Sequence, residues 1–314
     1  MLDTLAVGAR RASEDVTRAA EYFEYTSSAN PIGARLITAV PHRTFLASLY
    51  DSGATRVVPL DLSAQLRCQG PATGPGLLAS FVRIVRGEYV TLNPNATSQV
   101  FYAFDGSGTV QQGETMFPFA KGDFFALPGG VEAVLTADET ARIYNVNDEP
   151  LLSYLGVTLS KPRFSPTLYP ADQAQKELLK VASAPGAAGR NRVSVLLGNA
   201  NFPQTRTVTH SMWAMFGVLK ANSMQKPHRH QSIALDFISE CKPGCYTLVG
   251  TELDGEGNIV DPQRVDWSPG MAFVTPPGHW HAHFNESGAN GYLIPFQDAG
   301  LHTYLRSLDI RFAR

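Results

Sequence analysis

The chain has 314 residues and a formal net charge of -2, with 44% hydrophobic and 17% charged residues. This length predicts about two domains, each able to bury its own core. The nearly balanced charge gives no electrostatic basis for binding nucleic acid or an anionic membrane, and no apolar run approaches the roughly 20 residues that cross a bilayer.

Cysteine content and the first residues bear on the compartment. Three cysteines are too few and odd in number for a disulfide framework, so a reducing cytoplasm is expected. The opening stretch MLDTLAVGARRASEDV has too short an apolar run for a signal peptide, and its arginines follow that run. Cys241 and Cys245 flank an expected hairpin turn, where packing is the favoured interpretation because no further soft metal ligands stand nearby.

Turn-forming residues are frequent, with 27 Gly and 21 Pro, and the short apolar runs between them predict β structure. Residues 13–27 predict a surface helix, because a serine can cap it and acidic residues occupy its first turn. A second helix is expected over residues 170–183, with Pro near its start. The chain is therefore divided into an N-terminal helix and irregular arm (1–75), a first β domain (76–165), a linking helix and loop (166–192) and a second β domain (193–314).

The two β domains look like copies of one framework. The second contains Gly270, five mostly apolar residues, Pro276, one residue and Gly278. The first repeats this spacing over residues 122–130. Histidines occur only in the second copy: in this register His228, His230 and His281 correspond to Asn93, Asn95 and Ala133. A fold that needed these histidines for packing would need them twice, so they are interpreted as functional.

The three histidines form a candidate metal site. His228 and His230 occupy alternate positions of a predicted strand, so both imidazoles share one face, and His281 lies on another strand about fifty residues later. Imidazole binds Fe, Zn, Cu and Ni, and three histidines leave coordination positions open. We expect one divalent metal ion per chain, with packing as the alternative role.

His279 and His283 share the strand parity of His281. His279 directly follows the Pro-Pro-Gly turn and is interpreted as a rim residue. His283 lies one inward position deeper, where its imidazole is a candidate general base or a packing residue.

These motifs resemble those of a bicupin of the cupin superfamily. The stretch Gly270-x5-Pro276-x-Gly278-x2-His281-x3-Asn285 matches the second cupin motif, and the His-x-His of Pro227-His-Arg-His230 matches the core of the first. The surrounding residues HRHQSIAL and GHWHAHFN resemble gentisate 1,2-dioxygenase and its relatives. The resemblance covers roughly residues 78–314. It implies an all-β fold of two tandem cupin barrels (double-stranded β-helix, or jelly roll), with the N-terminal helix and the linking helix outside them.

The resemblance also implies a function. It implies a three-histidine Fe(II) site, with Zn, Ni or Mn as other metals, in a dioxygenase that opens an aromatic ring with O2. Many cupins add a Glu ligand four or five residues after the second His, where this chain has Ala234 and Leu235. In gentisate-type enzymes the residue at the position of His283 contacts substrate. The first barrel is expected to be degenerate and metal-free and to serve structure or oligomerisation, and the protein to be a homo-oligomer.

Asp236 departs from the resemblance. If the strand from His228 is unbroken, parity points the carboxylate of Asp236 into the cavity. Gentisate enzymes carry an Arg there that pairs with the substrate carboxylate, which an Asp would repel. A substrate other than gentisate is therefore expected, unless Arg206 or another arginine before Trp213 takes this role. The alternative interpretation is a rim Asp in a surface pair.

Two other functions remain open from the sequence. One is a metal-dependent cupin with isomerase, decarboxylase or hydrolase chemistry. The other is a non-catalytic bicupin that binds a small molecule.

Overall fold

The computed structural model describes residues 16–313, and the chain divides into a unit that ends at Ala39 and a larger unit that begins at Val40. In the smaller unit, α1 spans only Tyr25–Ser28. The side chain of Glu24 caps this helix by accepting hydrogen bonds from the backbone N–H groups of Thr26 and Ser27. The helix predicted over 13–27 is therefore wrong for residues 16–24, which form turns and irregular chain, while residues 13–15 lie outside the described part. Residues 16–27 are exposed and bury no apolar face, and an isolated helix of this length is marginal in water.

An eight-stranded antiparallel sheet forms the first barrel. The strands follow the order β2-β3-β8-β5-β7-β9, with β4 paired to β8 and β6 paired to β5. The two longest strands, of 15 residues each, pair along their whole length with register shifts near Asp105, so that both walls of the barrel share them. The bounds are β2 Arg56–Pro59, β3 Leu78–Ile84, β4 Tyr89–Leu92, β5 Ser98–Gln112, β6 Thr115–Ala120, β7 Phe124–Pro128, β8 Ala133–Asn147 and β9 Thr167–Tyr169.

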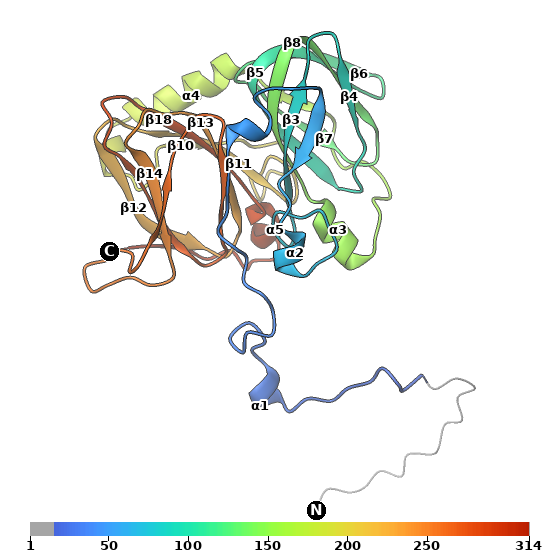
Figure 1. Ribbon diagram of the computed structural model, residues 1–314, viewed down its shortest axis with the longest axis vertical. Helices are drawn as coiled ribbons and strands as arrows, with labels where there is room; N and C mark the ends of the chain where they lie inside the picture. Colours follow the sequence, from blue (N-terminus) through green and yellow to red (C-terminus); the bar gives the residue numbers. More distant parts are fainter. Residues whose placement is uncertain (1–15, 314) are drawn as a thin grey trace, which may run out of the picture. The chain divides into compact units, whose positions relative to one another are not determined.

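Two sheets form the second barrel (Figure 1). One has six strands in the order β1-β16-β13-β18-β11-β10, and the other has five in the order β15-β14-β17-β12-β19. The bounds are β1 Thr44–Phe45, β10 Ser194–Leu196, β11 Trp213–Leu219, β12 Ser223–His230, β13 Ala234–Glu240, β14 Cys245–Gly250, β15 Gln263–Asp266, β16 Ala272–Thr275, β17 Trp280–Asn285, β18 Gly291–Gln297 and β19 Ile310–Phe312.

The arm expected to be irregular contains two short strands that tie it to the barrels. β1 pairs with β16 of the second barrel, and β2 pairs with β3 of the first. His42, just before β1, adds a hydrogen bond of 2.7 Å from Nδ1 to the carbonyl oxygen of Val274. The arm therefore completes one sheet edge in each barrel.

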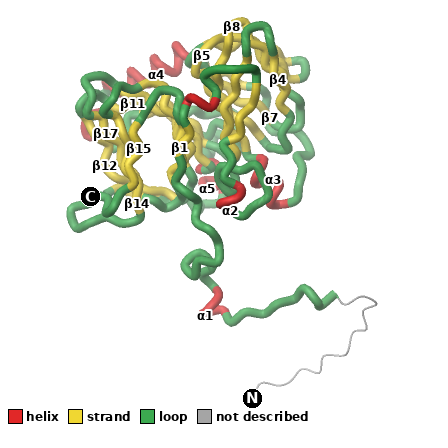
Figure 2. The backbone as a smooth tube through the Cα atoms, viewed as in Figure 1, coloured by secondary structure: helices red, strands yellow, loops and turns green. Residues whose placement is uncertain are grey.

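Short helices connect the strands, as Figure 2 shows in red among the yellow strands. The predicted linking helix is confirmed as α4, which spans Ala171–Ser183 and buries Leu178 against Val193 and Val218. The remaining helical elements are η1 Ala47–Leu49, α2 Ser63–Leu66, α3 Glu149–Leu155, η2 Ala187–Gly189 and α5 Ala299–Tyr304.

The two barrels share one apolar core. Tyr144 of β8 stacks on Phe237 of β13 and on Phe296 of β18, with ring centroids 4.9 and 5.5 Å apart. Phe81 of β3 joins them and stacks on Tyr50 at 4.2 Å. The predicted all-β class with two tandem barrels is confirmed, and the barrels pack as one unit.

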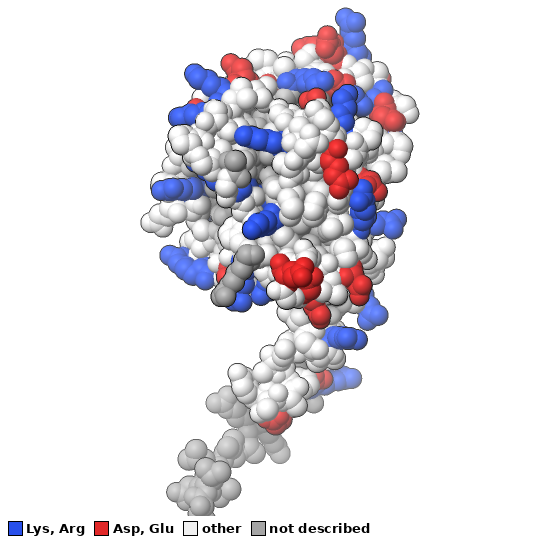
Figure 3. All heavy atoms as spheres, turned by 90° about the vertical axis from the view of Figure 1, so that its left-hand side faces the viewer, with Lys and Arg blue, Asp and Glu red and all other residues white. Residues whose placement is uncertain are grey.

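The surface carries charges of both signs. On the face drawn in Figure 3, basic and acidic side chains are interspersed among wide uncharged areas. None of the helices in the described part of the chain is long and apolar enough to span a membrane.

Candidate metal centre

The strand registers show which positions of the two barrels correspond. Ala133 pairs with Leu92 in the first barrel, and His281 pairs with His228 in the second. Leu92, rather than the predicted Asn93, therefore corresponds to His228. The correspondence predicted from the sequence is shifted by one residue here. The reason is that the segment from this position to the matching position of the next strand is one residue longer in the first barrel, from β4 to β5, than in the second, from β12 to β13.

The interiors of the barrels differ in chemistry. In the first barrel, Phe101, Ala133 and Leu135 are fully buried and pack into one apolar cluster. By register these positions correspond to Asp236, His281 and His283. The second barrel therefore carries polar side chains where the first is filled with hydrocarbon.

A cavity of about 120 Å³ lies inside the second barrel between its two sheets. The strands β12 and β17 contribute histidines from one sheet, and β13 contributes an acid from the other. The lining residues are Arg192, Ser194, Trp213, Met215, Gln225, His228, His230, Asp236, His281, His283, Leu293, Pro295, Gln297, Ile310 and Phe312.

The structure brings the three predicted metal ligands together. One ring nitrogen of each of His228, His230 and His281 lies within 4.8 Å of the others. All three side chains are buried, and His228 and His281 face one another across the pairing of β12 with β17. A register shift before His228 marks a bulge, a common way to aim a side chain at a site.

Hydrogen bonds fix the imidazole orientations. The Nδ1 atoms of His230 and His281 lie 2.8 and 3.1 Å from the carbonyl oxygens of Ser232 and His279, so Nδ1–H donates and Nε2 keeps its lone pair. Among the described residues, the buried Nε2 of His230 has no hydrogen-bond partner. A metal ion satisfies such an atom, and a carbonyl on the other ring nitrogen is the usual support of a ligating histidine. The residues present fit a bound metal.

The imidazoles are held neutral. Burial, reinforced by the neighbouring histidines, lowers the pKa values of His228 and His281 well below their ordinary range. Burial also lowers the pKa of His230 to about 4. Neutral imidazole is the form that binds metals. These histidines therefore do not have to release a proton when a metal binds near neutral pH.

His283 lies beside the three histidines. Its ring centroid is 5.8 Å from that of His281, and its Nδ1 is 2.8 Å from Thr247 Oγ1. Thr247 also accepts a hydrogen bond of 2.8 Å from Trp267 Nε1, so a buried chain of polar groups orients the imidazole. His279 does not line this cavity; it is partly exposed, as expected of a rim residue.

Asp236 faces the cavity from the opposite sheet. The strand assumed to be unbroken is two strands, β12 and β13, in different sheets, yet Asp236 still points inward. It is 2% exposed, so the alternative of a rim Asp in a surface pair is wrong. Thr275 Oγ1 donates to its carboxylate at 2.9 Å. Burial raises the pKa of Asp236 to about 7, against the opposing effects of Thr275 and Arg192.

Arg192 is a cavity residue that the sequence did not single out. It follows the linking helix, precedes β10, and its Nη2 contacts the ring nitrogens of His228. Burial lowers its pKa to about 9, while the charge of Asp236 opposes this. Arg206, the arginine named from the sequence, does not line the cavity. The only sequence prediction that covers Arg192 is the general one that another arginine before Trp213 could pair with the substrate carboxylate.

The barrel pair and the histidine cluster define the class: the chain has the fold of a bicupin of the cupin superfamily. Salicylate 1,2-dioxygenase from Pseudaminobacter salicylatoxidans is 14% identical with a TM-score of 0.66, and 87% of this chain and 88% of that one superpose. The structure of its gentisate adduct gives a TM-score of 0.68 at 13% identity, over 92% and 90% of the two chains. These likenesses show the fold.

Two curated relatives found by sequence comparison are both gentisate 1,2-dioxygenases. Gentisate 1,2 dioxygenase 1 of Aquipseudomonas alcaligenes is 26% identical over 137 residues, which are 44% of this chain and 36% of that protein. Gentisate 1,2-dioxygenase of a Streptomyces species is 28% identical over 98 residues, 30% of this chain and 27% of that protein. The aligned part thus spans roughly a third of the curated relatives it matches. No protein-family model matches the chain.

Proposed function

We propose that this protein is a metal-dependent oxygenase that opens the ring of a small aromatic substrate other than gentisate. His228, His230 and His281 would hold Fe(II), and O2 would be the second substrate. The carrying observation is the cluster of three buried histidines with one ring nitrogen of each within 4.8 Å of the others, and with the unpartnered Nε2 of His230 among them. The similarity to gentisate 1,2-dioxygenases supports ring cleavage as the reaction.

The chain's own residues prepare the site. Bound Fe(II) would supply open coordination positions for substrate and O2 and a path for electrons between them. His283, oriented by Thr247, would hold or move a proton of a substrate hydroxyl. Apolar side chains on the cavity wall, Leu293, Pro295 and Phe312, limit access of water to the reacting atoms.

Size and charge restrict the substrate. A cavity of about 120 Å³ lies below the 300–1,000 Å³ of most ligand pockets, which favours a single ring with few substituents. The charges of Arg192 and Asp236 attract each other, so a substrate carboxylate must compete with Asp236 for the arginine. A hydroxyl or amine can instead exchange a hydrogen bond with Asp236. We therefore place gentisate and salicylate among the poor substrates.

Oxygen consumption tests this function. Protein loaded anaerobically with Fe(II) is mixed with catechol, 2-aminophenol, gentisate and salicylate, and O2 uptake is compared with loss of the aromatic ring. We expect uptake matched to ring loss with a neutral hydroxylated or aminated ring, and near-background rates with the two carboxylates. His279→Ala serves as a control that should keep the activity. If no aromatic compound supports uptake by fully loaded protein, the oxygenase proposal is wrong.

Isomerase, decarboxylase or hydrolase chemistry at the same site is the second candidate. Neutral histidines also bind Zn, Ni and other divalent metals, and the small cavity suits compact non-aromatic substrates equally. Zinc or nickel, rather than iron, in protein purified without added metal would favour this candidate.

A further inference from the structure

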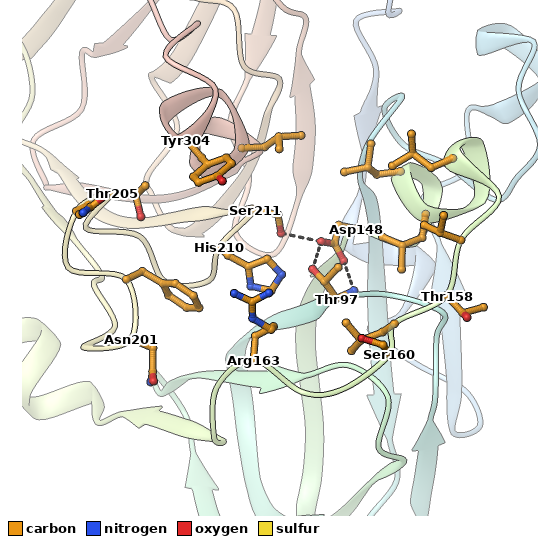
Figure 4. A pocket seen from close by; sticks show the side chains of 18 of the residues that line it. Thr97, Asp148, Thr158, Ser160, Arg163, Asn201, Thr205, His210, Ser211 and Tyr304 are labelled. Carbon is orange, nitrogen blue, oxygen red and sulfur yellow. Dashed lines mark hydrogen bonds between the residues drawn. The ribbon is translucent and has the colours of Figure 1, made fainter.

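A second and larger cavity, of about 790 Å³, lies apart from the metal centre and shares no lining residue with it (Figure 4). Its walls come from α3, the segment that follows α3, the loop before β11, and α5. The volume falls in the range of small-molecule sites. Most of the wall is apolar and is formed by Leu151, Leu152, Leu155, Val157, Leu159, Phe202 and Leu301.

Several of these apolar side chains are unusually exposed for their size. Leu155 is 57% exposed, Val157 is 48% exposed and Tyr304 is 64% exposed, and all three line this one cavity. Large apolar groups gathered around a concave surface mark a site that an apolar ligand covers.

Two nitrogen-bearing side chains in the cavity lack partners. The Nδ1 atom of His210 is buried and makes no hydrogen bond among the described residues. Arg163 makes no hydrogen bond or ion pair with any residue in the described part of the chain, and Figure 4 shows its guanidinium beside the His210 ring. The ring of Phe202 lies 5.5 Å from that of His210, next to these groups.

The acid of the cavity, Asp148, makes no hydrogen bond to either of them. Burial lowers the pKa of His210, and the charge of Asp148 opposes this larger effect by favouring the protonated imidazole. Asp148 is buried and accepts hydrogen bonds from the N–H groups of Thr97 and Ser98 at 2.7 and 3.3 Å and from Ser211 Oγ at 2.7 Å. Thr97 Oγ1 also contacts its carboxylate. With both oxygens of Asp148 engaged by their own donors, Arg163 and His210 remain for a ligand.

We propose that this cavity binds an amphipathic monocarboxylate. The carboxylate binds Arg163 and the Nδ1–H tautomer of His210, and the apolar body packs on the leucines of α3 and α5. Charge-assisted hydrogen bonds to arginine are strong and directional, and the leucine wall buries the hydrocarbon part. A neutral alcohol of the same chain length makes only the second kind of contact.

Calorimetric titration of metal-loaded protein with decanoate tests the proposal, with decanol as the uncharged probe. We expect decanoate to bind wild type at least tenfold more tightly than decanol. Arg163→Gln should weaken decanoate about tenfold, or about 1.4 kcal/mol, and leave decanol unchanged. Lys161→Gln is the matched control: it removes an exposed charge two residues away that does not line the cavity, and should change neither affinity by more than twofold.

Two further variants locate the ligand. Leu155→Asp, on the exposed rim of the cavity, should abolish decanoate binding, while His281→Ala, in the metal centre, should not change it. Circular dichroism of each variant checks that the fold is intact. Three results would overturn the proposal: no decanoate binding up to millimolar concentration, equal affinities of wild type and Arg163→Gln, or loss of binding in His281→Ala, which would place the ligand at the metal centre.

Discussion

Asp236 and Arg192 are the charged side chains that line the cavity of the metal centre. Their mutual attraction stabilises both charges, while burial opposes both. The charge of each residue therefore affects how strongly the other attracts a charged group of the substrate.

Asp236→Arg should improve the binding of carboxylated aromatics. The substitution replaces a competitor for Arg192 with a second cation, and each 1.4 kcal/mol gained is about tenfold in affinity. We expect KM for gentisate, measured by oxygen consumption, to fall at least tenfold. Asp236→Asn, which only removes the competing charge, should shift KM in the same direction by less. Efficient turnover of gentisate by wild type would show that the interpretation of Asp236 is wrong.

Asp236 should also make stability depend on pH. Because burial raises its pKa from 3.8 to about 7, the folded protein keeps a proton that the unfolded chain releases. This group alone should therefore lower the free energy of unfolding as pH rises from 4 to 7, by at most about 1.4 kcal/mol per pH unit, while the buried histidines with lowered pKa values act in the opposite direction. Chemical denaturation of metal-free protein across this window measures the slope. Because the other groups titrate in both proteins, the difference in slope isolates Asp236: with rising pH the free energy of unfolding should rise more, or fall less, in Asp236→Asn than in wild type. Identical slopes would contradict the assignment.

Side-chain alternation within strands was sufficient to predict some site residues and not others. His228, His230 and His281 lie on β12 and β17, which pair directly, so local periodicity and motif spacing predicted their convergence. Arg192 enters the cavity from a loop, where no periodicity applies. Asp236 was predicted to face inward on a wrong premise, an unbroken strand, because the chain crosses between sheets after His230.

At the scale of elements, the short strand β1 covers the edge of β16, the strand that precedes His281. Deletion of residues 1–39, the smaller compact unit, gives the reference Tm. Deletion of residues 1–46 also removes β1 and the hydrogen bond from His42 to Val274. Each lost hydrogen bond should lower the free energy of unfolding by about 1 kcal/mol. We expect Tm to fall by several degrees, because 1 kcal/mol corresponds to about 2–4 °C at this size. Equal Tm values for the two deletions would contradict a structural role of β1.

The same elements show the limit of sequence patterns. The repeated Gly-Pro-Gly framework predicted both barrels, and the segment 170–183, with Pro near its start, predicted α4. The strands β1 and β2 were missed because each is short and forms on a template supplied by a distant strand. The helix predicted over 13–27 was too long, because capping residues alone do not stabilise a helix that has no packed apolar face.

At the scale of the whole molecule, the shared aromatic core should make the barrels unfold together. Tyr144 of the first barrel packs on Phe237 and Phe296 of the second. Tyr144→Ala should cost about 3–5 kcal/mol, the usual cost of removing a large buried ring. Differential scanning calorimetry should show one transition for wild type and a single transition at lower temperature for the variant. Two separate transitions in wild type would contradict a common core.

Metal content measured per chain tests the central claim most directly. Protein loaded anaerobically with Fe(II) and freed of excess metal should contain about one iron per chain, and His279→Ala should contain the same amount. His281→Ala should contain almost none while its circular dichroism is unchanged, because the first barrel already folds with Ala133 at the corresponding position. Two metals per wild-type chain, or one retained by His281→Ala, would contradict a single metal centre in the second barrel.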